Sequence, residues 1–202
     1  NIKTSMQSLK NKVYKAFGLN ISSEIELPEL VLSADKADIL IKLGNVPDQI
    51  KNPLKTGIRY EAAAGEFLLK VDQIADYYVK NGKEITINMH QQADEASVRL
   101  FLLGSAFGAL LMQRGLIPMH ASSVLYNHKA LLFTGVSGVG KSTLAAGFYE
   151  KGFPVLDDDV SVINIQNNTP YVVPGYPQMK LWADVIKKLN KNPEDYQTVR
   201  NN

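Results

Sequence analysis

The sequence predicts an α/β protein of 202 residues in two parts, a small β-rich N-terminal module (1–93) and an α/β domain (94–202). Three observations predict this fold class. Short runs of alternating apolar and polar residues, typical of strands, fill the first part. A nearly all-apolar helical segment begins at about residue 94. A strand-like run, a glycine-rich loop and a helix-like run then follow one another over residues 130–150.

The N-terminal module contains several short strand candidates. They are residues 12–21, 37–43, 66–71, 75–79 and 84–89. Asn81-Gly82 separates the last two, and since both residues tolerate positive φ we expect a hairpin there. We interpret the cluster Glu24, Glu26 and Glu29 as a solvated face rather than a metal site, and His90 as structural or exposed.

A long apolar helix is expected over residues 96–114, with Asp94 as its N-cap and Gly115 as its stop. Gly104 and Gly108 lie four residues apart and would allow another element to approach closely. The helix is expected to join the two parts of the chain.

The elements after this helix alternate between hairpins and helices. Strands are expected at 119–126 and 130–134, joined by a tight turn, so that the strand before the glycine-rich loop is the second arm of a hairpin. That arrangement is unusual for a phosphate-binding loop, whose sheets are mostly parallel. A helix, a short strand, a second hairpin and a terminal amphipathic helix follow at 141–151, 153–156, 160–173 and 181–190.

Composition restricts the class of protein. The chain is 45% hydrophobic, has a net charge of +2 with both signs interspersed, and contains no cysteine. We therefore expect no nucleic-acid partner and no anionic-membrane partner, and disulfides and thiolate metal sites are excluded. The longest apolar stretch, 100–112, is too short to span a bilayer, and the N-terminus has no signal pattern. A soluble, cytoplasmic protein is the expectation.

Residues 135–142 match the full phosphate-loop (Walker A) motif G-x-x-x-x-G-K-[ST]. Its glycines allow backbone amides to turn inward around phosphate oxygens, Lys141 adds a charge for the β- and γ-phosphates, and the Ser142 hydroxyl suits Mg²⁺. The positive end of the following helix adds to the attraction. The predicted nucleotide-binding residues are Gly135, Ser137, Gly138, Val139, Gly140, Lys141, Ser142 and Thr143.

Three consecutive aspartates, Asp157, Asp158 and Asp159, end an apolar strand shortly after the loop. Phosphoryl transfer to a hydroxyl needs a carboxylate for Mg²⁺ and a base for the hydroxyl proton. Strand alternation would place Asp157 and Asp159 on one face and Asp158 on the other. An acidic turn at a strand end is the alternative interpretation, and we favour the functional one because the phosphate loop is close by.

The set formed by His120, the hairpin, the loop and the aspartate run resembles the HPr kinase/phosphorylase family, whose fold is related to ATP-dependent phosphoenolpyruvate carboxykinase. The resemblance covers about residues 116–165 and implies an HPr-kinase-like P-loop kinase domain. Further segments are similar to HPr-kinase-like proteins of lasso-peptide and other peptide-modification clusters: 14–19, 78–82, 100–104, 111–123 and 174–182. That similarity implies phosphorylation of a serine near the C-terminus of a precursor peptide.

The resemblance therefore implies a kinase that uses ATP and Mg²⁺ and transfers the γ-phosphoryl group to a serine of a precursor peptide or small protein. Lys141 would hold the phosphates, Ser142 and Asp158 the metal, Asp157 would act as base, and His120 would tune the aspartates or sense the γ-phosphate. Asp157 and Asp158 could exchange roles. The N-terminal module would recognise the acceptor, through a sheet edge or through Tyr77 and Tyr78 if they face outward.

Departures from the family leave several alternatives open. The glycine-rich signature with a glutamate that HPr kinases carry downstream is absent, and beyond Arg114 the chain has only Arg200. We therefore do not carry phosphorylase activity over, and we expect the sequence to be incomplete at its C-terminus. An HPr(Ser) kinase acting on a carrier protein, a nucleotide-binding switch and a small-molecule kinase remain alternatives. The acceptor, the choice of ATP or GTP and a homo-oligomeric state stay open.

Overall fold

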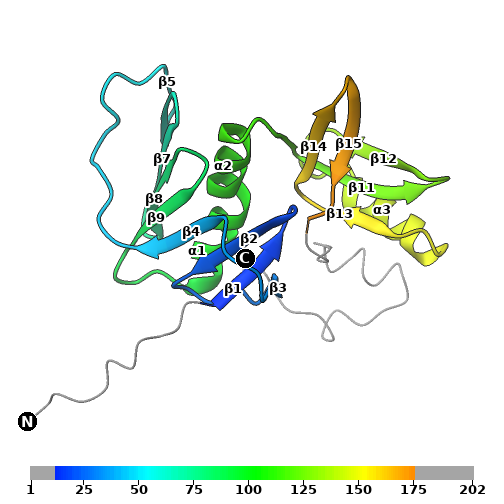
Figure 1. Ribbon diagram of the computed structural model, residues 1–202, viewed down its shortest axis with the longest axis horizontal. Coiled ribbons are helices and arrows are strands. Elements are labelled where there is room, and N and C mark those ends of the chain that lie inside the picture. The colour runs from blue at the N-terminus through cyan, green and yellow to red at the C-terminus, as the bar shows by residue number, and fades with distance from the viewer. Residues whose placement is uncertain (1–11, 176–202) are drawn as a thin grey trace, which may run out of the picture.

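The computed structural model describes residues 12–175 and shows a mostly β protein (Figure 1). Strands hold 43% of the described residues and helices 18%, in two continuous helical segments at 95–113 and 141–150. The predicted fold class, an α/β fold with an HPr-kinase-like P-loop kinase domain, is therefore wrong. A strand–loop–helix segment fixes only local geometry, and here hairpins rather than crossover helices join most neighbouring strands, so the sheets are largely antiparallel.

The N-terminal part forms one nine-stranded sheet in the order β3-β1-β2-β4-β9-β8-β7-β6-β5. Its neighbours pair antiparallel, except that β4 is parallel to both β2 and β9. The short strands β3 and β5 form the two edges. The strands are β1 Lys12–Ala16, β2 Leu19–Ser23, β3 Val31–Leu32, β4 Ile39–Leu43, β5 Lys55–Thr56, β6 Tyr60–Ala63, β7 Glu66–Val71, β8 Ala75–Lys80 and β9 Glu84–Met89.

Turn residues explain one confirmed prediction and one error in this sheet. Asn81 and Gly82 both have positive φ and join β8 to β9, as predicted for this hairpin. The run 12–21, predicted as a single strand, is instead a hairpin that turns at Phe17-Gly18. Phe17 has a φ of 50°, which is uncommon for an aromatic residue. Its side chain is buried, and the centre of its ring lies 5.9 Å from that of Phe107. Tertiary packing therefore decided a turn that the sequence pattern did not indicate.

The apolar helix begins at the predicted N-cap, where the Asp94 carboxylate accepts a hydrogen bond from the Ser97 amide at 2.8 Å. It runs through α1 Glu95–Phe101, the π-helical segment η1 Leu102–Ala106 and α2 Phe107–Gln113. The π-helical segment was not predicted. The expected close approach at Gly104 and Gly108 is also wrong, because a methyl group at either position would meet no atom within 4 Å.

This helix packs on the nine-stranded sheet (Figure 1). Its buried side chains, Val98, Leu102, Leu103, Ala106, Phe107, Leu110 and Leu111, belong to the same core cluster as the inward side chains of β1, β2, β4 and β7–β9. By length and hydropathy the helix would also suit a membrane span, but 44% of its apolar window is buried inside the protein. Its apolar character is explained by the core that it supplies.

Tyr77 and Tyr78 are poor candidates for recognising an acceptor. Tyr77 is fully buried in the core, and its hydroxyl donates to the Val98 carbonyl at 2.9 Å. Tyr78 is half-buried, and its hydroxyl donates to the Glu66 carboxylate. The condition set for a recognition role, that the side chain faces outward, is therefore not met by Tyr77, and substitution there would test stability rather than binding.

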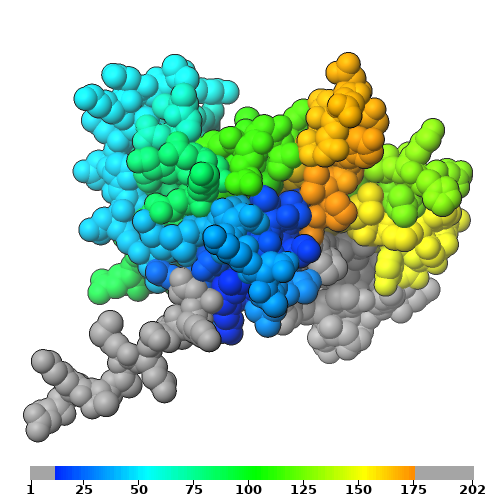
Figure 2. Space-filling model, viewed as in Figure 1, coloured from blue at the N-terminus to red at the C-terminus, as the bar shows by residue number. Residues whose placement is uncertain are grey.

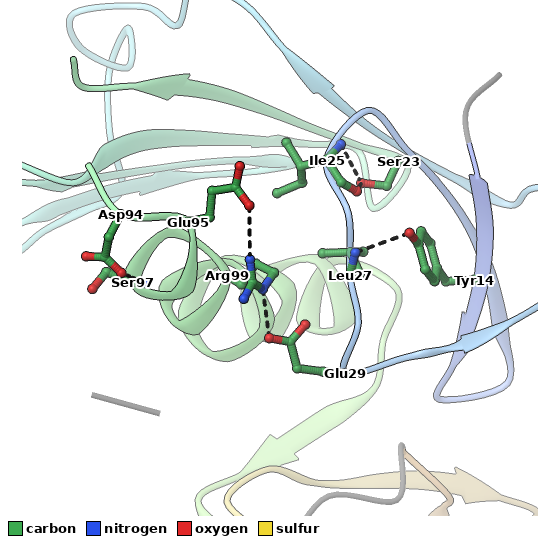
Figure 3. Close-up of polar contacts among 9 residues, drawn as sticks. All are labelled: Tyr14, Ser23, Ile25, Leu27, Glu29, Asp94, Glu95, Ser97 and Arg99. Carbon is green, nitrogen blue, oxygen red and sulfur yellow. Dashed lines mark hydrogen bonds and ion pairs between the residues drawn. The ribbon is translucent and has the colours of Figure 1, made fainter. Parts of the chain in front are cut away.

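The three glutamates near the β2–β3 connection do not share one environment, and Figure 3 shows the contacts of one of them, Glu29. Glu26 and Glu24 are exposed, in line with a solvated face, whereas Glu29 is mostly buried. One Glu29 oxygen pairs with the Arg99 guanidinium at 2.8 Å, and the other is buried without a hydrogen-bond partner in the described part of the chain. The solvated-face interpretation is wrong for Glu29, which ties the β2–β3 connection to α1.

The C-terminal part contains two three-stranded sheets, ordered β10-β14-β15 and β12-β11-β13. Their strands are β10 Ile117–Met119, β11 Ala121–Tyr126, β12 Lys129–Thr134, β13 Val155–Asp157, β14 Ser161–Gln166 and β15 Thr169–Val173, and α3 Lys141–Glu150 packs on the second sheet. The predicted hairpins at 127–129 and 167–168 are confirmed.

The two parts of the chain share core residues. Val162 of β14 belongs to the N-terminal core, and Val173 of β15 packs against it. In Figure 2 the orange end of the described chain lies against the dark-blue first strands. The predicted helix 181–190, the segment 176–182 and Arg200 lie outside the described residues.

Candidate phosphate-binding site

The loop between β12 and α3 has the backbone geometry that its glycines permit. Gly135, Gly138 and Gly140 have φ values of 153°, 80° and 99°, a region that side-chain-bearing residues rarely adopt. Residues 135–139 are exposed, and Gly140 is half-buried. The loop is therefore an open turn that presents its backbone to solvent.

The start of α3 adds a second source of anion affinity. Gly140 is its N-cap, and no side chain caps the first turn. The first amides of an α-helix have no partner within the helix, so those of α3 are available to an anion, and the helix dipole favours negative charge at this end. The predicted helix at 141–151 is thus confirmed, and its N-terminus directly follows the glycine-rich loop.

The Lys141 side chain lies beneath the loop and contacts its backbone. Its side chain is buried, with only 8% of the residue exposed, and its ammonium donates to the carbonyls of Gly135 and Val136, each at 3.1 Å. Both of these acceptors are neutral carbonyl oxygens, and a buried charge is stabilised best by a partner of opposite charge. An incoming phosphate would supply the negative partner that this charge lacks among the loop atoms that it contacts.

Sheet topology brings the aspartates to the same edge as the loop. β12 and β13 both pair antiparallel with β11, so they run parallel to each other on its two sides. Thr134, the last residue of β12, is opposite Ala121, and Asp157, the last residue of β13, is opposite Ser123. Both strands therefore end near the beginning of β11, where the phosphate loop and the aspartate run both start.

Asp158 lies on the face of this sheet that α3 covers. Its carboxylate accepts a 2.5 Å hydrogen bond from the Ser122 hydroxyl. The cross-strand neighbour of Ser122 is Phe133, whose ring lies 5.5 Å from that of Phe148 in α3. Asp158 therefore shares a face with the helix that begins at Lys141 and Ser142.

Asp157 lies on the opposite face, as strand alternation predicted. It is opposite Ser123, whose hydroxyl accepts from Ser161 at 3.0 Å, and its Oδ1 accepts from the Gly175 amide at 2.6 Å. Oδ2 is buried without a hydrogen-bond partner in the described chain. Burial raises the pKa of Asp157 to about 7, partly opposed by the Gly175 amide.

His120 contacts the third aspartate rather than the first two. Its Nδ1 lies 3.2 Å from a carboxylate oxygen of Asp159 and 3.0 Å from the Asp159 carbonyl. The ring is half exposed, and Asp159 itself has a φ of 78°, so the strand has already ended there. His120 was expected to lie beside the aspartate run, and the contact that the structure gives is with the last of the three. His120 therefore holds the turn that follows Asp157 and Asp158.

The side-chain oxygens at this site suit Mg²⁺ better than a metal whose ligands must all come from the protein. Asp158 and Ser142 offer oxygen ligands, and Mg²⁺ characteristically takes one or two carboxylates together with waters and substrate phosphates. Residues 12–175 contain no group of three His, Cys, Asp or Glu side chains placed to hold a metal by themselves. A metal at this site would therefore depend on the nucleotide for several of its ligands.

Two contacts at the site were missed by the sequence prediction. Ser122 is fully buried and bonded to Asp158, and Gly175 covers Asp157 through its amide. The pair Ser122-Ser123 in an otherwise apolar strand was a usable signal, since buried hydroxyls need partners. Nothing in the sequence pattern indicated Gly175.

Comparison of the chain with protein-family models, with curated proteins and with solved structures finds no match. Any assignment of function therefore depends on the residues of the site.

Proposed function

We propose that the protein binds ATP with Mg²⁺ at residues 135–143 and transfers the γ-phosphoryl group to a serine hydroxyl of a precursor peptide. The observation that carries the proposal is one juxtaposition. A glycine loop with a buried lysine and an aspartate run with two buried members, Asp157 and Asp158, meet at the same edge of one small sheet, on strands that run parallel. The proposal concerns the chemistry of this edge and not the α/β kinase fold, which the chain does not have.

The nucleotide would be held mainly by the backbone. Amides of Gly138, Gly140 and the first turn of α3 would surround the phosphates, and the Lys141 ammonium would turn from its two carbonyls toward the β- and γ-phosphate oxygens. Ser142 and Asp158 would hold Mg²⁺, which when bound neutralises charge developing on the transferred group. The common face of Asp158 and α3 supports this pairing.

Asp157 is the better candidate for the base. One of its oxygens has no hydrogen-bond partner within residues 12–175, and burial raises its pKa to about 7, close to the value that suits a general base at neutral pH. Asp158, in contrast, already accepts from Ser122 and is better suited to hold a cation. His120 would act indirectly, by fixing the Asp159 turn.

The acceptor is proposed on weaker grounds than the nucleotide. A carboxylate placed as base supports a hydroxyl acceptor, and only the resemblance to peptide-modifying kinases supports a peptide. The two edges of the nine-stranded sheet, β3 and β5, are the places where an extended peptide could add as a strand. Cytoplasmic location and possible self-association are part of the same proposal.

Mass spectrometry of an acceptor peptide tests this function. The peptide should be encoded beside this gene and carry a serine near its C-terminus. Incubated with protein, ATP and Mg²⁺, it should gain one phosphate on that serine, with one ADP and one proton released per phosphoester formed. A peptide with Ser→Ala at the acceptor is the matched control. ATP turnover without a phosphopeptide would instead favour a nucleotide-dependent switch or a small-molecule kinase.

A further inference from the structure

We propose that Ser122 is a positioning residue for the Mg²⁺ site, because its hydroxyl fixes the orientation of the Asp158 carboxylate. This inference rests on the proposed nucleotide site. Ser122 has no exposed surface, and its hydroxyl lies 2.5 Å from Asp158 Oδ1. A hydrogen bond to a charged carboxylate is stronger and more directional than one to a neutral acceptor.

The position of Ser122 in the sheet makes this contact rigid. It is the second residue of β11, the central strand of its sheet, and it pairs with Phe133 of β12 on the side that packs against α3. Asp158 follows β13 on the other side of β11 and is itself only 7% exposed. The Ser122 hydroxyl therefore ties the central strand β11 to the aspartate that follows β13. The neighbouring strand on the other side of β11, β12, leads into the phosphate loop.

The contribution of such a neighbour to metal affinity is known from other metal sites. Loss of a group that hydrogen-bonds a metal ligand typically weakens metal affinity 10- to 100-fold. Without the Ser122 hydroxyl, Asp158 loses the donor that holds its Oδ1. We therefore expect Mg²⁺ affinity to fall, with less effect on nucleotide binding by the loop amides.

The neighbouring residue supplies a matched control. Ser123 is also fully buried in β11, but it faces the opposite side of the sheet, where its hydroxyl is 3.0 Å from that of Ser161. Ser123→Ala removes the same atom from the same strand without touching Asp158. A difference between the two variants therefore reports the contact with Asp158 rather than the loss of a buried hydroxyl.

The experiment measures Mg²⁺ affinity directly, by calorimetric titration of Mg²⁺ into protein that is mixed with ADP, after circular dichroism has confirmed folding. Ser122→Ala should weaken Mg²⁺ binding about 10-fold or more, Ser122→Thr should restore it, and Ser123→Ala should match wild type. If Ser122→Ala does not fold, Ser122→Cys keeps the volume while weakening the donor. Equal Mg²⁺ affinity of the Ser122 and Ser123 variants would overturn the inference. Failure of wild type to bind Mg·ADP would instead reject the proposed function.

Discussion

Asp157→Asn is expected to remove most phosphoryl transfer while nucleotide binding stays near wild type. An amide cannot take the hydroxyl proton, and loss of a general base typically costs about 10²–10⁴-fold in rate. Kinase assays on the variant, with ADP titration as the binding control, measure the effect. Asp158→Asn is the matched comparison, since it should lose activity that is partly recovered at high Mg²⁺. If both variants behave as wild type, the aspartate run is only an acidic turn.

The same substitution is expected to stabilise the fold at neutral and alkaline pH. Burial raises the pKa of Asp157 from 3.8 to about 7, so the folded protein binds this proton more tightly than the unfolded chain. Its contribution to stability is complete below about pH 4 and is lost as the pH rises to 7, a change on the order of 4 kcal/mol. Asp157→Asn removes this loss and retains an oxygen for the Gly175 amide.

Urea unfolding at pH 4, 6 and 8 in metal-free buffer tests this stability effect. The free energy of unfolding of Asp157→Asn should exceed that of wild type at pH 8, and the difference should shrink toward pH 4. A variant that is less stable than wild type at pH 8 would show that the Asp157 carboxylate is not held in a desolvating environment. Stability and transfer should therefore change in opposite directions, as expected for a buried functional carboxylate.

Lys141→Ala is expected to weaken ATP binding by about 10- to 150-fold, the range that corresponds to losing a charged hydrogen-bond partner worth roughly 1.5–3 kcal/mol. The Lys141 ammonium is buried beneath the loop carbonyls, so no exposed lysine can replace it. Transfer should fall at least as far, since in the proposed complex the same charge would also contact the γ-phosphate.

Two further variants make the lysine experiment specific. Lys141→Met keeps most of the buried stem and separates loss of charge from loss of packing. Lys151→Ala removes an exposed lysine at the other end of α3 and should bind ATP as wild type does. Unchanged ATP affinity in a folded Lys141→Met protein would show that the loop does not bind phosphate.

Local features of the fold were predictable, and long-range ones were not. Asn81-Gly82 and the Asp94 cap act within a few residues, and their turn and cap occur where predicted. The parallel insertion of β4 between β2 and β9 depends on pairing between segments 18 residues apart for β2 and 44 residues apart for β9, for which local periodicity carries no signal. The fold class was wrong because it was inferred from the loop motif, although the hairpin predicted before that loop already pointed to an antiparallel sheet.

The candidate site also has a part that was predictable from local sequence and a part that depends on long-range pairing. The loop glycines, Lys141 and α3 are contiguous in sequence, so the strand–loop–helix order sufficed to predict them. The partners of the aspartates come from distant strands, since Ser122 lies 36 residues before Asp158 and Gly175 lies 18 residues after Asp157. Only the pairing of β11 with β13 brings Ser122 to Asp158, and the sequence had left open which aspartate faces the helix.

Titration of ADP into the wild-type protein in the presence of Mg²⁺ tests the central claim most directly, because it requires no knowledge of the acceptor. The claim is that residues 135–143 form a nucleotide site that uses a metal. We predict one saturable site per chain, with affinity that drops when Mg²⁺ is chelated and drops further in Lys141→Met. Absence of saturable ADP binding by folded wild-type protein would contradict the claim.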